Sequence, residues 1–242
     1  MATDIIDYRL VGDDMQGVII TLDPGEAVYA EAGAMMYMED GIHMATTLSP
    51  TGEAGGIFDK LLGAGKRLLM GESFFITLFG NASSVRRDIA FATPTPGKIF
   101  VCDLKQWGYE VIAQKDAFLC AARGVEMDIA FTKKIGVGFF GGEGFILQRL
   151  RGNGLAFLSA SGTLIERELE RDEVLRVDTG CFVAMQASVG YDIEMVQGIK
   201  NMVFGGEGMF YLSLTGPGRV ILQTLPFSRL AARVLAHAPR RS

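Results

Sequence analysis

The five residues Gly141-Gly142-Glu143-Gly144-Phe145 recur 64 positions later as Gly205-Gly206-Glu207-Gly208-Met209. The match extends on both sides at the same spacing, where Phe140 corresponds to Phe204 and Gly152 to Gly216. Glycines at fixed places in a matched apolar pattern mark positions where the backbone takes a conformation, or makes a close approach, that a side chain would prevent. A more diverged copy, Gly71-Glu72-Ser73-Phe74, lies earlier in the chain. The sequence therefore predicts three similar copies of one structural element.

The upstream part of this element repeats as well. Four residues match at a spacing of 147, namely Leu22, Glu26, Gly33 and Met38 with Leu169, Glu173, Gly180 and Met185. The copies are predicted at about 17–93, 97–160 and 162–225, in a single domain over 1–242 with a C-terminal tail over 226–242. The first copy carries 12 extra residues, placed within 51–64. Copies of about 64 residues exceed most solenoid repeats, so each is expected to be a small sheet unit, and the three to be arranged with pseudo-threefold symmetry.

Each copy reads as short strands separated by turns. Val18–Leu22 and Ala27–Ala30 flank a Pro-Gly turn, and Leu164–Leu169 and Val174–Val177 flank a polar turn at the matching place. We expect both pairs to form β-hairpins, because Pro, Gly and acidic residues between apolar runs are typical of tight turns. The Glu- and Arg-rich segment 165–175 also suits a helix, but its alignment with the Pro-Gly turn favours strands. Two further hairpins are predicted over 145–158 and 210–222, across Asn-Gly and Pro-Gly turns.

Two helices are predicted. A short one lies around 56–62, and the other runs from Ser228, the expected N-cap, to His237. The second helix is expected to cover a sheet edge or to pack on a neighbouring subunit. Met35, Met36 and Met38 are expected in a core strand, with an adaptable exposed surface as the alternative.

Composition narrows the class of protein. Hydrophobic residues make up 49% of the 242 residues, 31 are glycine and 7 are proline, which is typical of a turn-rich globular chain. The mean hydropathy of +0.26 calls for a large core or a buried subunit interface. The longest stretch without a charged residue, Gly152–Ile165, has 14 residues, whereas a membrane-spanning helix needs about 20. The N-terminus shows no secretory signal, and three cysteines without a C-x-x-C motif favour a reducing, cytoplasmic location.

The sequence contains no pattern that predicts catalysis. Its two histidines, His43 and His237, stand 194 positions apart, and no metal-binding His/Cys motif or nucleophile elbow is present. Gly63–Arg67 resembles part of a phosphate loop, but Arg67 stands where Ser or Thr is needed, so a glycine turn is favoured. A net charge of −5 without a basic stripe argues against nucleic acid. We therefore expect no enzyme activity, cofactor or metal.

Several motifs together resemble a known family. They are the strands over 164–177 followed by Asp178-Thr179-Gly180, the Gly-Gly-Glu-Gly-Phe unit, and Gly216-Pro217-Gly218. Over nearly the whole chain the sequence resembles the Aim-twenty-four family of mitochondrial biogenesis proteins. The resemblance implies an all-β fold of the double-stranded β-helix type, similar to the tryptophan RNA-binding attenuation protein, and an oligomer. It implies no catalytic residue. Eukaryotic members are mitochondrial, but this chain shows no Arg- and Ser-rich transit peptide, so that location is not carried over.

One glutamate in each copy is a candidate binding residue. Glu72, Glu143 and Glu207 are each framed by small residues, and a pseudo-threefold axis would bring them together. Converging carboxylates would suit a hard cation or a basic partner. The favoured alternative is that each carboxylate accepts hydrogen bonds from the glycine-rich turn beside it.

These observations predict a non-enzymatic, oligomeric β-protein that acts as a scaffold or binding module, with a protein partner as a further possibility. The alternative is an RNA- or small-ligand-binding module, which rests on fold analogy alone, and the acidic composition counts against RNA. A third hypothesis is an enzyme with an unrecognised pocket.

Overall fold

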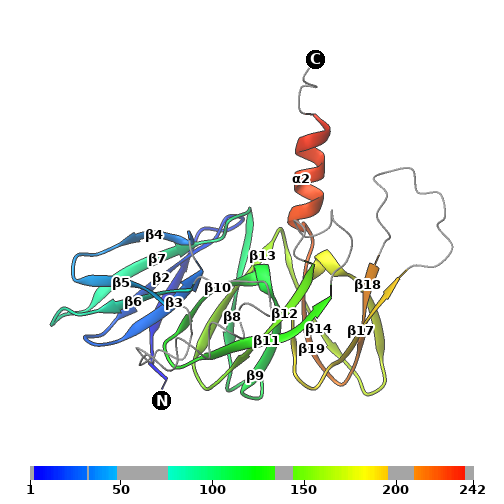
Figure 1. The fold of residues 1–242 in the computed structure, drawn as a ribbon, viewed down its shortest axis with the longest axis horizontal. Helices are drawn as coiled ribbons and strands as arrows, with labels where there is room; N and C mark the ends of the chain where they lie inside the picture. Colours follow the sequence, from blue (N-terminus) through cyan, green and yellow to red (C-terminus); the bar gives the residue numbers. More distant parts are fainter. Residues whose placement is uncertain (1–2, 32, 48–75, 134–143, 196–209, 238–242) are drawn as a thin grey trace, which may run out of the picture.

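The protein is nearly all β, as a computed structural model that describes residues 3–31, 33–47, 76–133, 144–195 and 210–237 shows (Figure 1). Its one α-helix among these residues is α2 (Phe227–Ala236), near the C-terminus, and two short 3₁₀ turns, Lys115–Ala117 and Thr179–Cys181, precede strands. The predicted all-β class with a short C-terminal helix is therefore confirmed. The predicted helix at 56–62 lies outside the described residues.

The described strands from β2 to β19 fall into three sets of six consecutive strands, which we call units 1, 2 and 3. Unit 1 contains β2 (Gly17–Leu22), β3 (Ala27–Glu31), β4 (Met35–Met38), β5 (Ile42–Thr47), β6 (Ile76–Asn81) and β7 (Arg87–Ala92). Unit 2 contains β8 (Gly97–Asp103), β9 (Glu110–Gln114), β10 (Phe118–Ala122), β11 (Glu126–Lys133), β12 (Phe145–Arg151) and β13 (Leu155–Ser161). Unit 3 contains β14 (Leu164–Leu169), β15 (Val174–Asp178), β16 (Phe182–Gln186), β17 (Gly190–Met195), β18 (Phe210–Thr215) and β19 (Gly218–Gln223). An extra strand, β1 (Asp7–Val11), precedes unit 1.

The strands of each unit pair in the same order. The sixth strand lies between the first and third in one sheet, and the fifth lies between the fourth and second in another. A register irregularity recurs where the third strand meets the sixth, between Met35 and Tyr37, Phe118 and Cys120, and Phe182 and Ala184. A bulge at the same place in three strands indicates that the equivalence extends to single residues.

Neighbouring units are joined edge to edge. Strand β3 of unit 1 pairs with β10 of unit 2, and β9 of unit 2 pairs with β16 of unit 3. The result is four sheets, with strand orders β1-β2-β7-β4, β5-β6-β3-β10-β13-β8, β11-β12-β9-β16-β19-β14 and β15-β18-β17. We call these sheets A, B, C and D. Because B and C each contain strands of two units, the units are joined by backbone hydrogen bonds as well as by packing.

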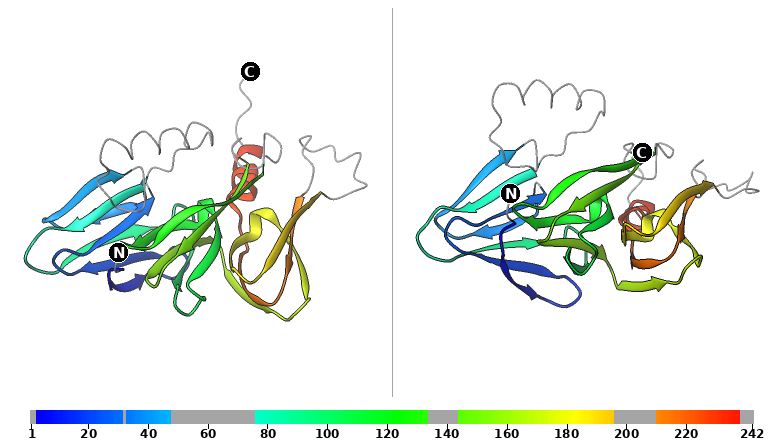
Figure 2. Two further views of the ribbon diagram at one scale, coloured as in Figure 1. Left: turned by 60° about the horizontal axis from the view of Figure 1, so that its bottom comes forward. Right: turned by 90° about the horizontal axis from the view of Figure 1, so that it is seen from below.

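Buried side chains of the described residues form three hydrophobic cores between the four sheets. The first lies between A and B and includes Phe79, Phe91 and Phe157. The second lies between B and C around Trp107, and the third lies between C and D around Phe182. Each core is centred on one unit. The units follow one another along the long axis of the molecule (Figures 1 and 2), so the predicted grouping around a shared centre is not confirmed.

The predicted hairpins are wrong in their pairing, although their strands and turns are present. The strands β2 and β3 lie in sheets A and B, and β14 and β15 lie in C and D. The same holds for β12 with β13 and for β18 with β19. The turns at Gly25, Gly108 and Asp172, which all have positive φ, carry the chain from one sheet to the facing sheet. Local turn chemistry sets the reversal of the chain, but packing across the core decides the partner strand.

The N-terminus of α2 also differs from the prediction. The N-cap is Pro226 and not Ser228, the first helical residue is Phe227, and no side chain caps the helix. No residue of α2 is buried, so it covers no sheet edge of its own chain. In Figure 1 the helix stands away from the sheets, and an ion pair between Arg229 and Asp178, 2.8 Å long, links its first turn to β15.

Candidate functional site

The three candidate glutamates, Glu72, Glu143 and Glu207, lie outside the described residues. Each belongs to the segment between the fourth and fifth strands of its unit. Their convergence on a binding site therefore stays a prediction.

Within the described ranges, no group of three or more His, Cys, Asp and Glu residues is placed to hold a metal ion. Cys102 and Cys120 are fully buried, and Cys181 is partly exposed. Burial raises the pKa of the Cys102 thiol to about 12 and also raises that of Cys120. Protonated thiols in apolar surroundings are poor nucleophiles, so these two residues act in packing.

Ion pairs occupy most of the arginines that the structure describes. Across β9, β12 and β11, Arg149 lies 3.0 Å from Glu110, and Arg151 lies 2.6 Å from Asp128. Glu126 adds a weaker contact with Arg151 at 3.9 Å. Such cross-strand pairs stabilise the sheet locally and neutralise its positive charge. They form an alternating ladder of charges rather than a basic stripe.

At each end of the row of units, one described strand lacks the neighbour that its equivalents in the other units have. The third strands β10 and β16 pair with the unit before them, whereas β4 has no partner on that side among the described residues. The second strands β3 and β9 pair with the unit after them, whereas no described strand pairs with β15 on that side. An unpaired edge offers free backbone N–H and C=O groups to another strand.

Most side chains of β4 are exposed, whereas the equivalent side chains of the third strands in units 2 and 3, β10 and β16, are buried. Met36 occupies the bulge position and is 59% exposed, while Leu119 and Val183 at the same position are 1% and 0% exposed. Tyr37 and Met38 are also exposed, and only Met35 packs on the core. The prediction of a core strand is therefore wrong for most of β4. The reason is that Leu119 and Val183 enter the core of the preceding unit, and unit 1 has no preceding unit.

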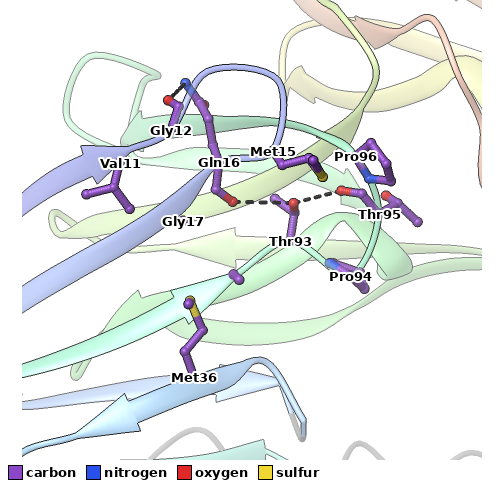
Figure 3. A pocket seen from close by; sticks show the side chains of 11 residues that line it. Val11, Gly12, Met15, Gln16, Gly17, Met36, Thr93, Pro94, Thr95 and Pro96 are labelled. Atoms are coloured by element: carbon purple, nitrogen blue, oxygen red, sulfur yellow. Dashed lines mark hydrogen bonds between the residues drawn. The ribbon is translucent and has the colours of Figure 1, made fainter.

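A shallow pocket of about 320 Å³ adjoins this strand (Figure 3). Met36, Met15 and Gly17 line it together with the connection 92–96. Thr93 donates hydrogen bonds from its Oγ1 to the carbonyl oxygens of Gln16, at 3.4 Å, and Thr95, at 2.8 Å. None of the described residues that line the pocket is titratable, so they offer mainly apolar contact and no acid or base group.

Helix α2 is a second exposed apolar surface. Phe227, Val234 and Leu235 are all more than half exposed. Neither α2 nor any other helix in the described ranges is long and apolar enough to cross a membrane.

Three six-stranded units that share their sheets edge to edge define an all-β protein built from repeated sheet units. The sequence model of the mitochondrial biogenesis AIM24 family matches residues 8–225, so the chain belongs to this family. The family resemblance seen in the sequence is thereby confirmed. It is similar to M6_Spy0233, an uncharacterised protein of Streptococcus pyogenes, with 27% identity over 227 residues that cover 93% of this chain and 88% of the relative. It also has the fold of the crystal structure of SPYM3_0169 from Streptococcus pyogenes, with a TM-score of 0.74 and 21% identity, over 96% of this chain and all of that one.

Proposed function

We propose that the protein is a non-enzymatic scaffold that works as an assembly of several copies of its own chain. The observation that carries this proposal is the exposure of Met36, whose equivalents in units 2 and 3 are buried in the core of the preceding unit. Exposed apolar surface of this kind is typical of a protein interface. The high mean hydropathy supports the same conclusion, because a buried subunit interface accounts for part of it.

The mass of the native protein tests this proposal. Native mass spectrometry and light scattering on the purified full chain are expected to show a multiple of 26.2 kDa that falls on dilution. A mass of one chain at every concentration up to about 100 μM would contradict the proposal, because assemblies with micromolar dissociation constants are populated there.

The second candidate is a small-ligand-binding module, and the pocket beside Met36 is the observation that favours it. A lining of methionine, proline and glycine suits a small apolar molecule. Denaturing mass spectrometry of the purified protein would identify such a molecule by its release. Recovery of one apolar compound at a fixed ratio to the chain would favour this candidate, and its absence from a fully assembled protein would contradict it.

The RNA-binding alternative has weaker support. The arginines of the β9–β12–β11 ladder are paired with carboxylates, and the chain is acidic. We therefore expect no salt-sensitive mobility shift with bulk RNA. A shift that disappears between about 50 and 200 mM salt would restore this alternative, since phosphate binding depends steeply on salt.

A further inference from the structure

We infer that a second copy of the chain adds to the first with its β15 beside β4, as a continuation of the joints between the units. This inference rests on the proposed self-assembly and specifies the interface. The two internal joints are β3 with β10 and β9 with β16, in both cases the second strand of one unit with the third strand of the next. The pair missing from this series is β15 with β4.

The other sheet edges do not fit this role. In the described residues the fourth strands β5, β11 and β17 are edge strands in all three units, and so are the first strands β8 and β14. The outer side of β2 is covered by β1. Among the described strands, only the second and third strands pair with a neighbouring unit in some units and are open in others. Addition of β15 to β4 would join sheet D to sheet A in the same order of strands that sheets B and C already have.

The internal joints also predict the register. Ala30 faces Cys120, and Ala113 faces Ala184. Tyr37 is equivalent to Cys120, because each is the first paired residue after the bulge. Val177 is equivalent to Ala113, because the residues that they face, on β18 and on β12, occupy the same position in their units. Tyr37 of one copy is therefore expected to face Val177 of the other. The next pair along the strands is Met38 with Arg176.

Burial at the internal joints shows what the new joint would cover. Cys120 and Ala184 are fully buried, whereas Tyr37 is 43% exposed. The pocket beside Met36 lies on the face of unit 1 that a preceding unit would cover. Gly17, in the pocket lining, occupies the position that Ile99 has in unit 2. Ile99 is covered in this way, because it enters the core of unit 1. The last unit of a preceding copy would thus cover the open face of unit 1, as the preceding unit covers the equivalent face in units 2 and 3.

The new joint is more polar than the internal ones. Arg176 and Tyr211 occupy the positions that Ile112 and Leu147 have in unit 2, and the Arg176 guanidinium lies 5.7 Å from the Tyr211 ring centroid. The aliphatic part of Arg176 would pack along Met38 while its charge stays in water. We therefore expect a reversible contact. Because the two edges differ, the contact is heterologous, and repeated addition gives a ring or an open row.

A cross-link in the predicted register tests this inference. In a Cys181→Ser background, Met38→Cys is combined with Arg176→Cys. These two positions lie in sheets A and D, at opposite ends of the row of units within one chain. Mild oxidation is expected to give reducible dimers and larger species. The matched control combines Met38→Cys with Glu168→Cys, which lies on the open edge of β14 and should not cross-link.

The outcomes separate this inference from the proposed function. A native mass of several chains without cross-links, or with equal cross-links in the control, overturns the β4–β15 joint and leaves self-assembly standing. A mass of one chain at all concentrations overturns both. As a second variant, Met36→Lys is expected to lower the assembled fraction at least tenfold. Met44→Lys, which changes an equally exposed methionine on β5, is expected to leave it unchanged. Equal assembly of the two variants also overturns the inference.

Discussion

The guanidinium group of Arg219 lies over the ring of Trp107, 4.4 Å from its centroid. Arg219 belongs to β19 of unit 3 and Trp107 to the turn after β8 of unit 2, so this cation–π contact links two units. The same guanidinium donates a hydrogen bond to the carbonyl oxygen of Gln106 and lies 3.7 Å from Glu166. Trp107 itself is buried and packs edge to face on Phe100.

Substitution of this arginine is expected to weaken the contact between units 2 and 3. Arg219→Ala should lower the free energy of unfolding by about 1–2 kcal/mol, because a partly desolvated cation–π contact and a hydrogen bond are lost together. Urea unfolding followed by Trp107 fluorescence measures the change. The matched control, Arg167→Ala, removes an exposed pair with Glu173 at 3.3 Å and should cost less than about 1 kcal/mol. Equal losses in both variants would contradict the role given to Arg219.

Gly97 is expected to tolerate no side chain. A Cβ atom there would lie 2.1 Å from the carbonyl oxygen of Ala160 on the paired strand β13. We expect Gly97→Ala to lower the free energy of unfolding by about 2 kcal/mol or more, because the two strands must separate. In Gly80→Ala, the nearest atom to the new Cβ is 3.7 Å away, so that variant should lose less than about 1 kcal/mol. Thermal or urea unfolding of the pair provides the comparison, and a neutral Gly97→Ala would show that the strands are not as closely paired as described.

The three cysteines are expected to react in a fixed order. Cys181 is partly exposed, and Cys102 and Cys120 are fully buried; burial raises the thiol pKa of all three, so the difference between them is access to the reagent. A raised pKa keeps a thiol protonated at neutral pH, and only the thiolate reacts. In native protein at pH 8, iodoacetamide should therefore modify Cys181 first, as peptide mass spectrometry can show. In guanidinium chloride all three should react at similar rates, and equally fast labelling in the native protein would contradict the buried placement.

The repeated glutamates are expected to serve their own turns. In Glu72→Gln/Glu143→Gln/Glu207→Gln, the shift of the melting temperature caused by millimolar Ca²⁺ or Mg²⁺ should equal that of the parent chain. The reason is that a carboxylate hydrogen-bonded by neighbouring turn amides has little capacity left for a cation. A stabilisation by divalent ions that only the parent shows would instead establish a shared cation site.

Much of the fold could be read from sequence because its signals are local. The strands around the turn at Gly25 and the polar turn at Asp172 are where their apolar runs place them. Hairpin pairing could not be read, since each of these turns connects two facing sheets and the partner strand comes from elsewhere in the unit. The exposure of Met36 was only the alternative interpretation of its methionine-rich strand, because such a strand also suits a core.

The amino-acid sequence by itself predicted three similar copies and determined the all-β class and the positions of the described strands around their turns, since turn chemistry and apolar runs depend only on residues near one another. The tertiary structure decided which strands share a sheet and which equivalent positions are buried. The physical reason is that Leu119, Val183 and Met36 occupy the same place in their units, but only the first two have a preceding core to enter. Position in the row, and not residue type, leaves β4 and β15 open.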